Sequence, residues 1–152
     1  MNIPGNFVIR VYAIIVNENQ EVLISDEFQL GIKMTKFPGG GLEFGEGTID
    51  GLKRELREEC NSQELINIKH FYTTDFFQKA HFYNNKQLIS IYYQAELAKP
   101  VRFPISNNPF NFTVNKNGNQ SFRWVKIKNL NADEITFPID KFVAGKLKLH
   151  FL

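Results

Sequence analysis

A glycine-rich segment that runs directly into a densely charged one is the feature that most constrains this chain. The segment is FPGGGLEFGEGTIDGLKRELREECNS, residues 37–62. Five of its acids fall within fourteen consecutive residues: Glu46, Asp50, Glu55, Glu58 and Glu59. On a helix, like charges at i, i+3 and i+4 repel each other by a few tenths of a kcal/mol per pair. Crowding of this kind requires a compensating partner.

The charged half of the segment predicts a helix that begins at Thr48 and ends at Asn61. Thr48 suits the N-cap, and Asn61 suits the C-terminal stop because asparagine tolerates left-handed backbone better than most residues. At about 100° per residue, four residues form one apolar stripe of this helix. They are Ile49, Leu52, Leu56 and Cys60. We expect this stripe to face the core.

A second face of the same helix gathers the carboxylates Glu55, Glu58 and Glu59. Gly51 lies on this face one turn earlier, where the missing side chain leaves space. The cluster has two interpretations, one of which is a solvated face whose acids pair with Lys53, Arg54 and Arg57. The other is a site for a divalent cation, since hard cations such as Mg²⁺ prefer oxygen ligands. The pattern alone does not decide between them.

The full spacing favours the metal site. The segment resembles the Nudix box, G-x5-E-x7-R-E-U-x-E-E-x-G-U, where U is a bulky aliphatic residue. The first seven specified positions match in register: Gly40, Glu46, Arg54, Glu55, Leu56, Glu58 and Glu59. The last two depart, because Asn61 replaces glycine and Ser62 replaces the aliphatic residue. Neither departure changes a carboxylate, so Gly40–Ser62 is identified as a near-complete box of the MutT-like Nudix hydrolase family.

The resemblance implies a set of roles for the matching residues. A divalent metal, Mg²⁺ or Mn²⁺, is implied to bind Glu55, Glu58 and Glu59, with the backbone carbonyl of Gly40 as a further ligand. Arg54 is implied to orient a glutamate, and Glu46 to pair with Arg54 and tie the loop to the helix. The backbone of Gly39, Gly40 and Gly41 is expected to contact the substrate.

The resemblance also implies a reaction. Water attacks a phosphorus of a nucleoside diphosphate linked to a further group X, and the metal neutralises the diphosphate charge and lowers the pKa of a bound water. For the acceptor of the water's proton, residues 102–124 offer no acid. Glu96 is the nearest other candidate, and it reads more simply as an edge or surface residue. We therefore expect a box glutamate to act as the base, with Glu58 first because it lies at the rim of the cluster.

The elements around the box predict mostly strands. Residues 7–16 and 21–28 are rich in β-branched and aromatic residues and flank the turn residues NENQ, which predicts a hairpin. Two further strands are expected at 64–77 and 86–97, and the last strand at 121–127. A long, polar, partly mobile loop is expected at 98–120, and a closing helix at 138–151.

These elements predict an α+β or α/β domain with a mixed, largely antiparallel sheet and helices packed on it. The resemblance narrows this to an α/β/α sandwich with a catalytic loop-helix. A chain of 152 residues suits a single domain, residues 1–152. A formal charge of +2 gives no strong nucleic-acid signature, and one cysteine excludes an intrachain disulfide. With no apolar run of membrane-spanning length and no leader pattern, we expect a cytoplasmic protein, and a homodimer is left open.

The substrate is the least constrained feature. A nucleoside triphosphate or a related nucleotide, such as a nucleotide sugar, is the expected small-molecule partner, and no proline marks residues 62–98 as in many ADP-ribose hydrolases of the family. One or two aromatic side chains between residues 71 and 93 are candidates to stack on a base, although most are expected in the core. They are Phe71, Tyr72, Phe76, Phe77, Phe82, Tyr83, Tyr92 and Tyr93. The alternative is a non-hydrolytic Nudix-like domain that senses a nucleotide or sugar nucleotide; such domains often lose box acids, which this chain retains.

Overall fold

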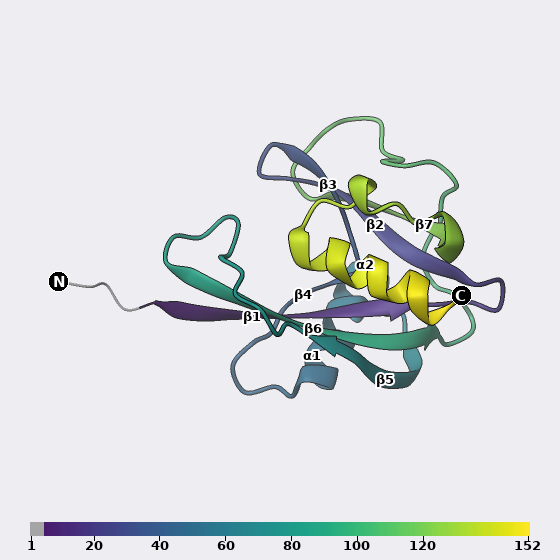
Figure 1. Ribbon diagram of the computed structural model, residues 1–152. Coiled ribbons are helices and arrows are strands. Elements are labelled where there is room, and N and C mark those ends of the chain that lie inside the picture. Colours follow the sequence, from purple (N-terminus) through teal and green to yellow (C-terminus); the bar gives the residue numbers. More distant parts are fainter. Residues whose placement is uncertain (1–4) are drawn as a thin grey trace.

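The computed structural model describes residues 5–152 and arranges them as strands between two α-helices (Figure 1). The strands are β1 Asn6–Ile15, β2 Glu21–Gln29, β3 Ile32–Lys36, β4 Gly39–Gly41, β5 Leu65–Thr73, β6 Lys86–Leu97 and β7 Asn119–Lys126. The α-helices are α1 Thr48–Glu59 and α2 Pro138–His150. Two short 3₁₀ helices, which the sequence did not predict, are η1 Ile127–Asn129 and η2 Ala132–Glu134. No helix in this part of the chain is long and apolar enough to span a membrane.

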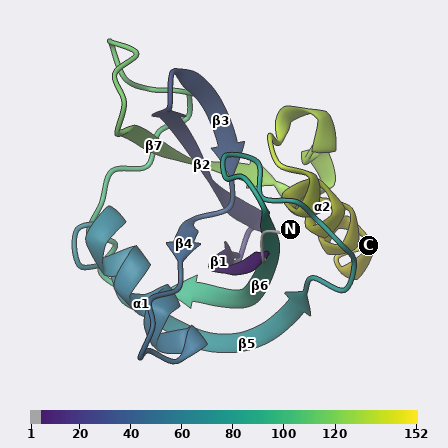
Figure 2. The same cartoon turned by 90° about the vertical axis from the view of Figure 1, so that its left-hand side faces the viewer.

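The strands form two sheets rather than the single one expected. The first has the order β4-β1-β6-β5, and the second β3-β2-β7. Only β1 and β6 pair in parallel, and all other ladders are antiparallel. Figure 2 shows α1 and α2 on opposite sides of these strands. The α/β class, the mixed and largely antiparallel pairing, and the sandwich arrangement are therefore confirmed.

Strand β1 explains why both helices can pack on the same layer. Its alternate residues Val11, Ala13 and Ile15 belong to the core cluster that includes Leu52 and Leu56 of α1. The residues between them, with Val16 just beyond the strand, face the cluster that includes α2; they are Tyr12, Ile14 and Val16. Successive side chains of a strand point to opposite faces. An uninterrupted apolar run therefore marks a strand buried on both faces.

The prediction that β1 and β2 form a hairpin is correct only for the turn between them. The turn forms, with the Asn17 N–H donating to the Glu21 carbonyl at 3.1 Å. The two strands then share only an isolated bridge between Val16 and Val22. Each is already paired on both edges, β1 by β4 and β6 and β2 by β3 and β7. Pairing with more distant strands satisfies their backbone groups and separates them into different sheets.

Helix α1 begins and ends within a residue or two of its predicted limits. Its N-cap is Gly47 rather than Thr48, whose hydroxyl instead lies 2.6 Å from the Tyr93 hydroxyl. Its C-cap is Cys60, and Asn61 adopts the expected left-handed backbone with φ of 52°. Of the predicted apolar stripe, Ile49 is 38% exposed and the other three residues are buried. The stripe therefore contacts the core only after the first helical turn.

The glycines expected in a loop form strand β4 instead. Gly39 and Gly40 are buried, and they pair with Tyr12 and Val11 of β1. At Gly39, φ is 144° and an added Cβ would overlap the carbonyl oxygen of Val11. Such a close approach of two backbones, at such a φ, requires glycine. The glycines therefore bring β4 against β1 rather than expose a loop of backbone groups.

The long segment before β7 contains no helix or strand, as predicted. A buried carboxylate holds it in place: Asp26 on β2 accepts the Phe110 N–H at 3.2 Å. The same carboxylate accepts hydrogen bonds from the Arg123 guanidinium on β7, at 2.7 and 3.3 Å, and from the Thr35 hydroxyl at 2.8 Å. The loop is thus fixed to the second sheet at Phe110. Its mobility elsewhere stays a prediction.

The orientation of α1 predicts a large loss of stability at one of its aliphatic residues and a small loss at another. Leu56 is fully buried, so Leu56→Ala should cost about 2–5 kcal/mol of unfolding free energy. Ile49 is 38% exposed, so Ile49→Ala should cost about 1 kcal/mol or less. Urea denaturation of the two variants beside the native chain measures both values. Equal losses would contradict the observed phase of the helix.

Candidate functional site

Arg54 links the loop after β4 to helix α1. Its Nη2 donates to Glu46 Oε1 at 2.7 Å and to the Gly41 carbonyl at 2.9 Å, and its Nε donates to Glu46 Oε2 at 3.0 Å. These hydrogen bonds from Arg54, together with one from the Glu43 N–H, lower the pKa of Glu46 to about 2. The ion pair expected between Glu46 and Arg54 is therefore present. It is a two-bond guanidinium–carboxylate contact, which is among the stronger polar contacts in proteins.

Gly51 lets that loop approach the helix. An added Cβ at Gly51 would lie 2.6 Å from Leu42 Cδ1 and 2.8 Å from Glu46 Oε1. The space that the sequence predicted at Gly51 is therefore filled by the loop itself. Any larger residue would push Glu46 away from Arg54.

The three box glutamates do not share one environment. Arg54 Nη1 donates to Glu55 Oε1 at 3.1 Å and to Glu58 Oε2 at 3.3 Å. The Glu55 side chain is 14% exposed and its carboxylate lies against Gly40, where an added Cβ would be 2.5 Å from Glu55 Oε2. The Glu58 side chain is 59% exposed. Glu55 therefore lies inside the site, and Glu58 lies at its rim as predicted.

Glu59 faces the second sheet. Gln120 Nε2 on β7 lies 3.4 Å from Glu59 Oε2 and 3.2 Å from Glu27 Oε2 on β2. Burial, followed by repulsion from Glu27 and Glu55, raises the pKa of Glu59 to about 7 despite the nearby Lys36. The negative charge at Glu59 is thus only partly compensated by the protein.

A buried ion pair between Lys36 and Glu27 lies beside Glu59, and neither residue is among those that the sequence predicted for the site. Lys36 Nζ lies 3.1 Å from Glu27 Oε2, and both residues are buried. The same ammonium donates to the carbonyls of Phe37 at 3.3 Å and of Gly39 at 3.2 Å. A signal was present in the sequence: Glu27 continues an apolar strand, and Lys36 immediately precedes FPGGG. Charged residues at such positions are rarely buried unless they are paired.

The sequence predicted that three carboxylates hold a divalent cation. Among residues 5–152, no group of three or more His, Cys, Asp or Glu side chains is placed to hold a metal ion. Arg54 Nη1 holds Glu55 and Glu58 side by side, whereas Glu59 faces Gln120 on β7, so the three expected carboxylates do not converge on one point. Glu55 and Glu59 do fit a hard cation, since both are partly buried carboxylates and the charge of Glu55 helps to raise the pKa of Glu59. The absence of a side chain at Gly40 lets the Glu55 carboxylate lie directly against the backbone of β4.

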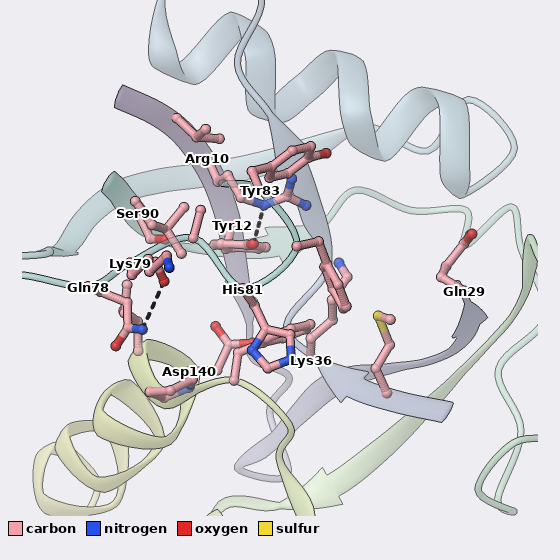
Figure 3. A pocket seen from close by; sticks show the side chains of 18 of the residues that line it. Arg10, Tyr12, Gln29, Lys36, Gln78, Lys79, His81, Tyr83, Ser90 and Asp140 are labelled. Carbon is pink, nitrogen blue, oxygen red and sulfur yellow. Dashed lines mark hydrogen bonds between the residues drawn. The ribbon is translucent and has the colours of Figure 1, made fainter. Parts of the chain in front are cut away.

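A cavity of about 390 Å³ lies beside this cluster, between the strands and the start of α2 (Figure 3). Glu27 and Lys36 line it, so it adjoins the buried ion pair. Figure 3 shows Arg10, Tyr12 and Tyr83 grouped at one end of the cavity, with the Arg10 Nε donating to the Tyr12 hydroxyl at 2.5 Å. Of the eight aromatic candidates from the sequence, three line the cavity: Phe82, Tyr83 and Tyr92.

Asp140, the third residue of α2, supplies a buried carboxyl at the cavity wall. It accepts hydrogen bonds from the Tyr92 hydroxyl and from the Phe37 N–H, the latter at 3.4 Å. Burial raises the pKa of Asp140 to about 6, although these hydrogen bonds and nearby Lys36 and Arg10 oppose the rise. The cavity therefore offers a group that donates or accepts a proton near neutral pH.

Glu96, weighed as an alternative base, lies on the β5–β6 ladder opposite Ile66. Its carboxylate accepts from Asn67 Nδ2 at 2.5 Å. Glu96 is exposed on β6, which lies between β1 and β5, so it is a surface residue rather than an edge residue. Among the described residues the histidines belong to no metal-binding group, although His81 lines the cavity of Figure 3.

The chain also matches a known protein family. The model of the NUDIX domain matches residues 6–145. An RNA pyrophosphohydrolase of Bartonella clarridgeiae is 29% identical over 116 residues, a match that covers 69% of this chain and 64% of the relative. The chain thus spans less than two thirds of that relative.

Solved structures share the fold. One comes from a study of MutT from Aliivibrio salmonicida and Vibrio cholerae; it has a TM-score of 0.63 and 22% identity, and the match covers 96% of this chain and 100% of that one. A NUDIX hydrolase from Nitrosomonas europaea has a TM-score of 0.67 and 16% identity, with coverage of 98% and 90%. At these identities the likeness concerns the fold alone.

The buried Asp140 makes stability depend on pH in a defined direction. Its pKa is about 6 in the folded chain, against a usual value of 3.8. Folding therefore favours the protonated carboxyl, and its contribution to the unfolding free energy is largest below about pH 4 and falls as the pH rises through about 6. A difference of about two pKa units corresponds to about 3 kcal/mol.

Asp140→Asn removes this titration. Urea denaturation from about pH 4 to about pH 7 should show the native chain losing up to about 3 kcal/mol relative to the variant. Other titrating groups cancel in this comparison because both proteins share them. A difference between the two proteins that does not change with pH would contradict the burial of an ionisable carboxyl at this position.

Proposed function

The chain belongs to the NUDIX family, and we propose that it hydrolyses a diphosphate linkage in a nucleoside diphosphate derivative with the help of a divalent cation. One observation carries the proposal: Arg54 holds the glycine segment, the loop and helix α1 together, so that Glu55 lies against Gly40. Glu59 lies near enough to Glu55 for the two carboxylates to repel each other. A cation between them would remove that repulsion and attract a diphosphate.

We assign Glu55, Glu59 and the backbone carbonyl of Gly40 as the central metal ligands. Glu58 completes the set in this proposal, since its ion pair with Arg54 is solvent-exposed on the glutamate side and such pairs contribute little. When bound, Mg²⁺ or Mn²⁺ neutralises the diphosphate and polarises its phosphoryl oxygens. Arg54 keeps Glu55 oriented, and Glu46 keeps Arg54 in place.

The nucleoside part of the substrate is assigned to the cavity of Figure 3. Tyr83 and Phe82 are partly exposed aromatic rings at its wall, suited to stacking on a base. Arg10 and Lys36 add positive charge for the phosphates. The base contacts are completed by polar groups of the wall such as Asp140.

The proposed chemistry is direct attack of water. Cys60 is fully buried, and burial raises the pKa of its thiol, so it is not available as a nucleophile. The oxygen of one water forms a bond to one phosphorus while the bridging oxygen leaves on the other. Glu58, at the rim of the cluster, accepts one proton of that water, and both protons end in solvent or on the two phosphate products. No bond between enzyme and substrate forms.

The reaction is tested in ¹⁸O-labelled water with Mg²⁺. The panel holds a nucleoside triphosphate, a nucleotide sugar, an RNA that carries a pyrophosphate group, as the name of the Bartonella relative suggests, and AMP. In a single turnover the label should appear on one phosphate product, and AMP should be inert. Chelation by EDTA should abolish turnover. Turnover of AMP without turnover of any diphosphate compound would exclude the proposal, and tight binding without turnover would favour the non-hydrolytic alternative.

A matched pair of variants separates the site from the surface. Glu59→Gln should lower kcat by about 100-fold or more, because it removes a ligand charge at the reacting phosphate. It should leave stability unchanged or raised, since it relieves repulsion between partly buried carboxylates. Glu134→Gln, at an exposed residue of η2, should change neither property. Full activity of Glu59→Gln would refute the assignment.

A further inference from the structure

A second cavity, of about 470 Å³, opens at the C-terminal end of α1. Its walls come from the end of that helix, from the loop that precedes β7 and from the first residues of β7. The loop is held to the body of the domain by the hydrogen bond from the Phe110 N–H to the buried Asp26. The loop wall of this cavity is therefore anchored to the second sheet next to Asn111.

The polar lining of this second cavity consists almost wholly of amides and hydroxyls. These side chains are Asn61, Ser106, Asn111, Asn119, Gln120 and Ser121. No Lys, Arg or His is among the described residues that line it, and Glu59 is the one charged residue. The Asn111 side chain makes no hydrogen bond to any described residue, so both its donors and its acceptor are available.

The remaining wall is apolar and partly aromatic. Phe103 and Phe122 meet edge to face, with ring centroids 5.1 Å apart, and Ile105 lies beside them. A surface that combines ring and aliphatic carbon with amides suits a ligand whose carbon skeleton also carries many hydroxyls. Such walls bury the ligand's C–H groups and satisfy its O–H groups at the same time.

The second cavity reaches the carboxylates of the proposed reaction. Glu59 lines it, and so does Gln120, whose Nε2 contacts both Glu59 and Glu27. Glu27 in turn lines the first cavity. The two cavities therefore adjoin at the Glu27–Gln120–Glu59 contact. A substrate with its nucleoside in the first cavity and its diphosphate at Glu55 and Glu59 would direct its other end into the second.

We infer that the second cavity binds the group X of the substrate, and that X is an uncharged, polyhydroxylated group such as a hexose or pentose. The inference rests on the proposed function and names its substrate class as nucleotide sugars. A terminal phosphate carries about −1.5 to −2 charge at neutral pH. It would enter a cavity in which no described Lys, Arg or His side chain is present to neutralise it, and this lack of a positive partner selects against nucleoside triphosphates.

The inference is tested by comparing two substrates that share a nucleoside, the nucleoside diphosphate hexose and the nucleoside triphosphate. With Mg²⁺, KM for the nucleotide sugar should be at least about tenfold lower, the size of one good hydrogen bond. Equal KM values, or a lower KM for the triphosphate, would overturn the inference while leaving hydrolysis of diphosphates intact.

Two leucine variants of the loop test whether the second cavity causes the lower KM for the nucleotide sugar. Asn111→Leu should raise KM for the nucleotide sugar about tenfold, leave kcat within about twofold, and leave both constants for the triphosphate unchanged. Asn115→Leu is the control, because Asn115 is exposed on the same loop and does not line the cavity. Loss of activity toward both substrates in Asn111→Leu, or equal effects of the two variants, would overturn the assignment.

Measurements of binding without hydrolysis distinguish a failure of this inference from a failure of the proposed function. If neither compound were hydrolysed, the proposed function would fail, and titration calorimetry in Ca²⁺ would then decide the role of the cavity. Tighter binding of the nucleotide sugar than of the plain nucleoside diphosphate, with the gain lost in Asn111→Leu, would support it. No gain from the sugar would overturn it.

Discussion

The contact between Arg54 and Glu46 is the interaction on which the site depends. It joins a short loop to a helix, and the same guanidinium reaches the Gly41 carbonyl, Glu55 and Glu58. One permanent positive charge thus organises several carboxylates that would otherwise repel each other. It does not neutralise Glu59, whose pKa is raised by burial and by neighbouring acids. The protein therefore orders part of its acid cluster and leaves the rest for a cation.

Glycine makes this arrangement sterically possible at three places. Gly39 lets β4 approach β1, Gly40 leaves room for the Glu55 carboxylate, and Gly51 lets Glu46 lie on the helix. At each position a Cβ would occupy space held by backbone or by a carboxylate. The glycines are thus packing residues first. Their expected contact with substrate through exposed backbone stays a proposal, because Gly39 and Gly40 are buried in a strand.

Local patterns in the sequence predicted α1, β6 and α2, because spacing along one element decides them, and the resemblance to the Nudix box implied the Glu46–Arg54 pair. Patterns failed where distant pairing decides the outcome. The β1–β2 turn reads as a hairpin, yet each strand is paired on both edges by strands far along the chain. Similarly, Glu27, Lys36 and Asp140 reach the site only through the sheet order, and Glu59 contacts Gln120 on β7, a contact that spacing along the helix cannot predict.

The proposed function depends above all on a divalent cation held by Glu55, Glu59 and the Gly40 carbonyl. Crystals grown with several millimolar Mn²⁺ and measured where manganese scatters anomalously test it most directly. The account predicts an anomalous peak within coordination distance of oxygens from all three residues, and its loss in Glu59→Gln. No peak at this position, or a peak held only by other residues, would contradict the account.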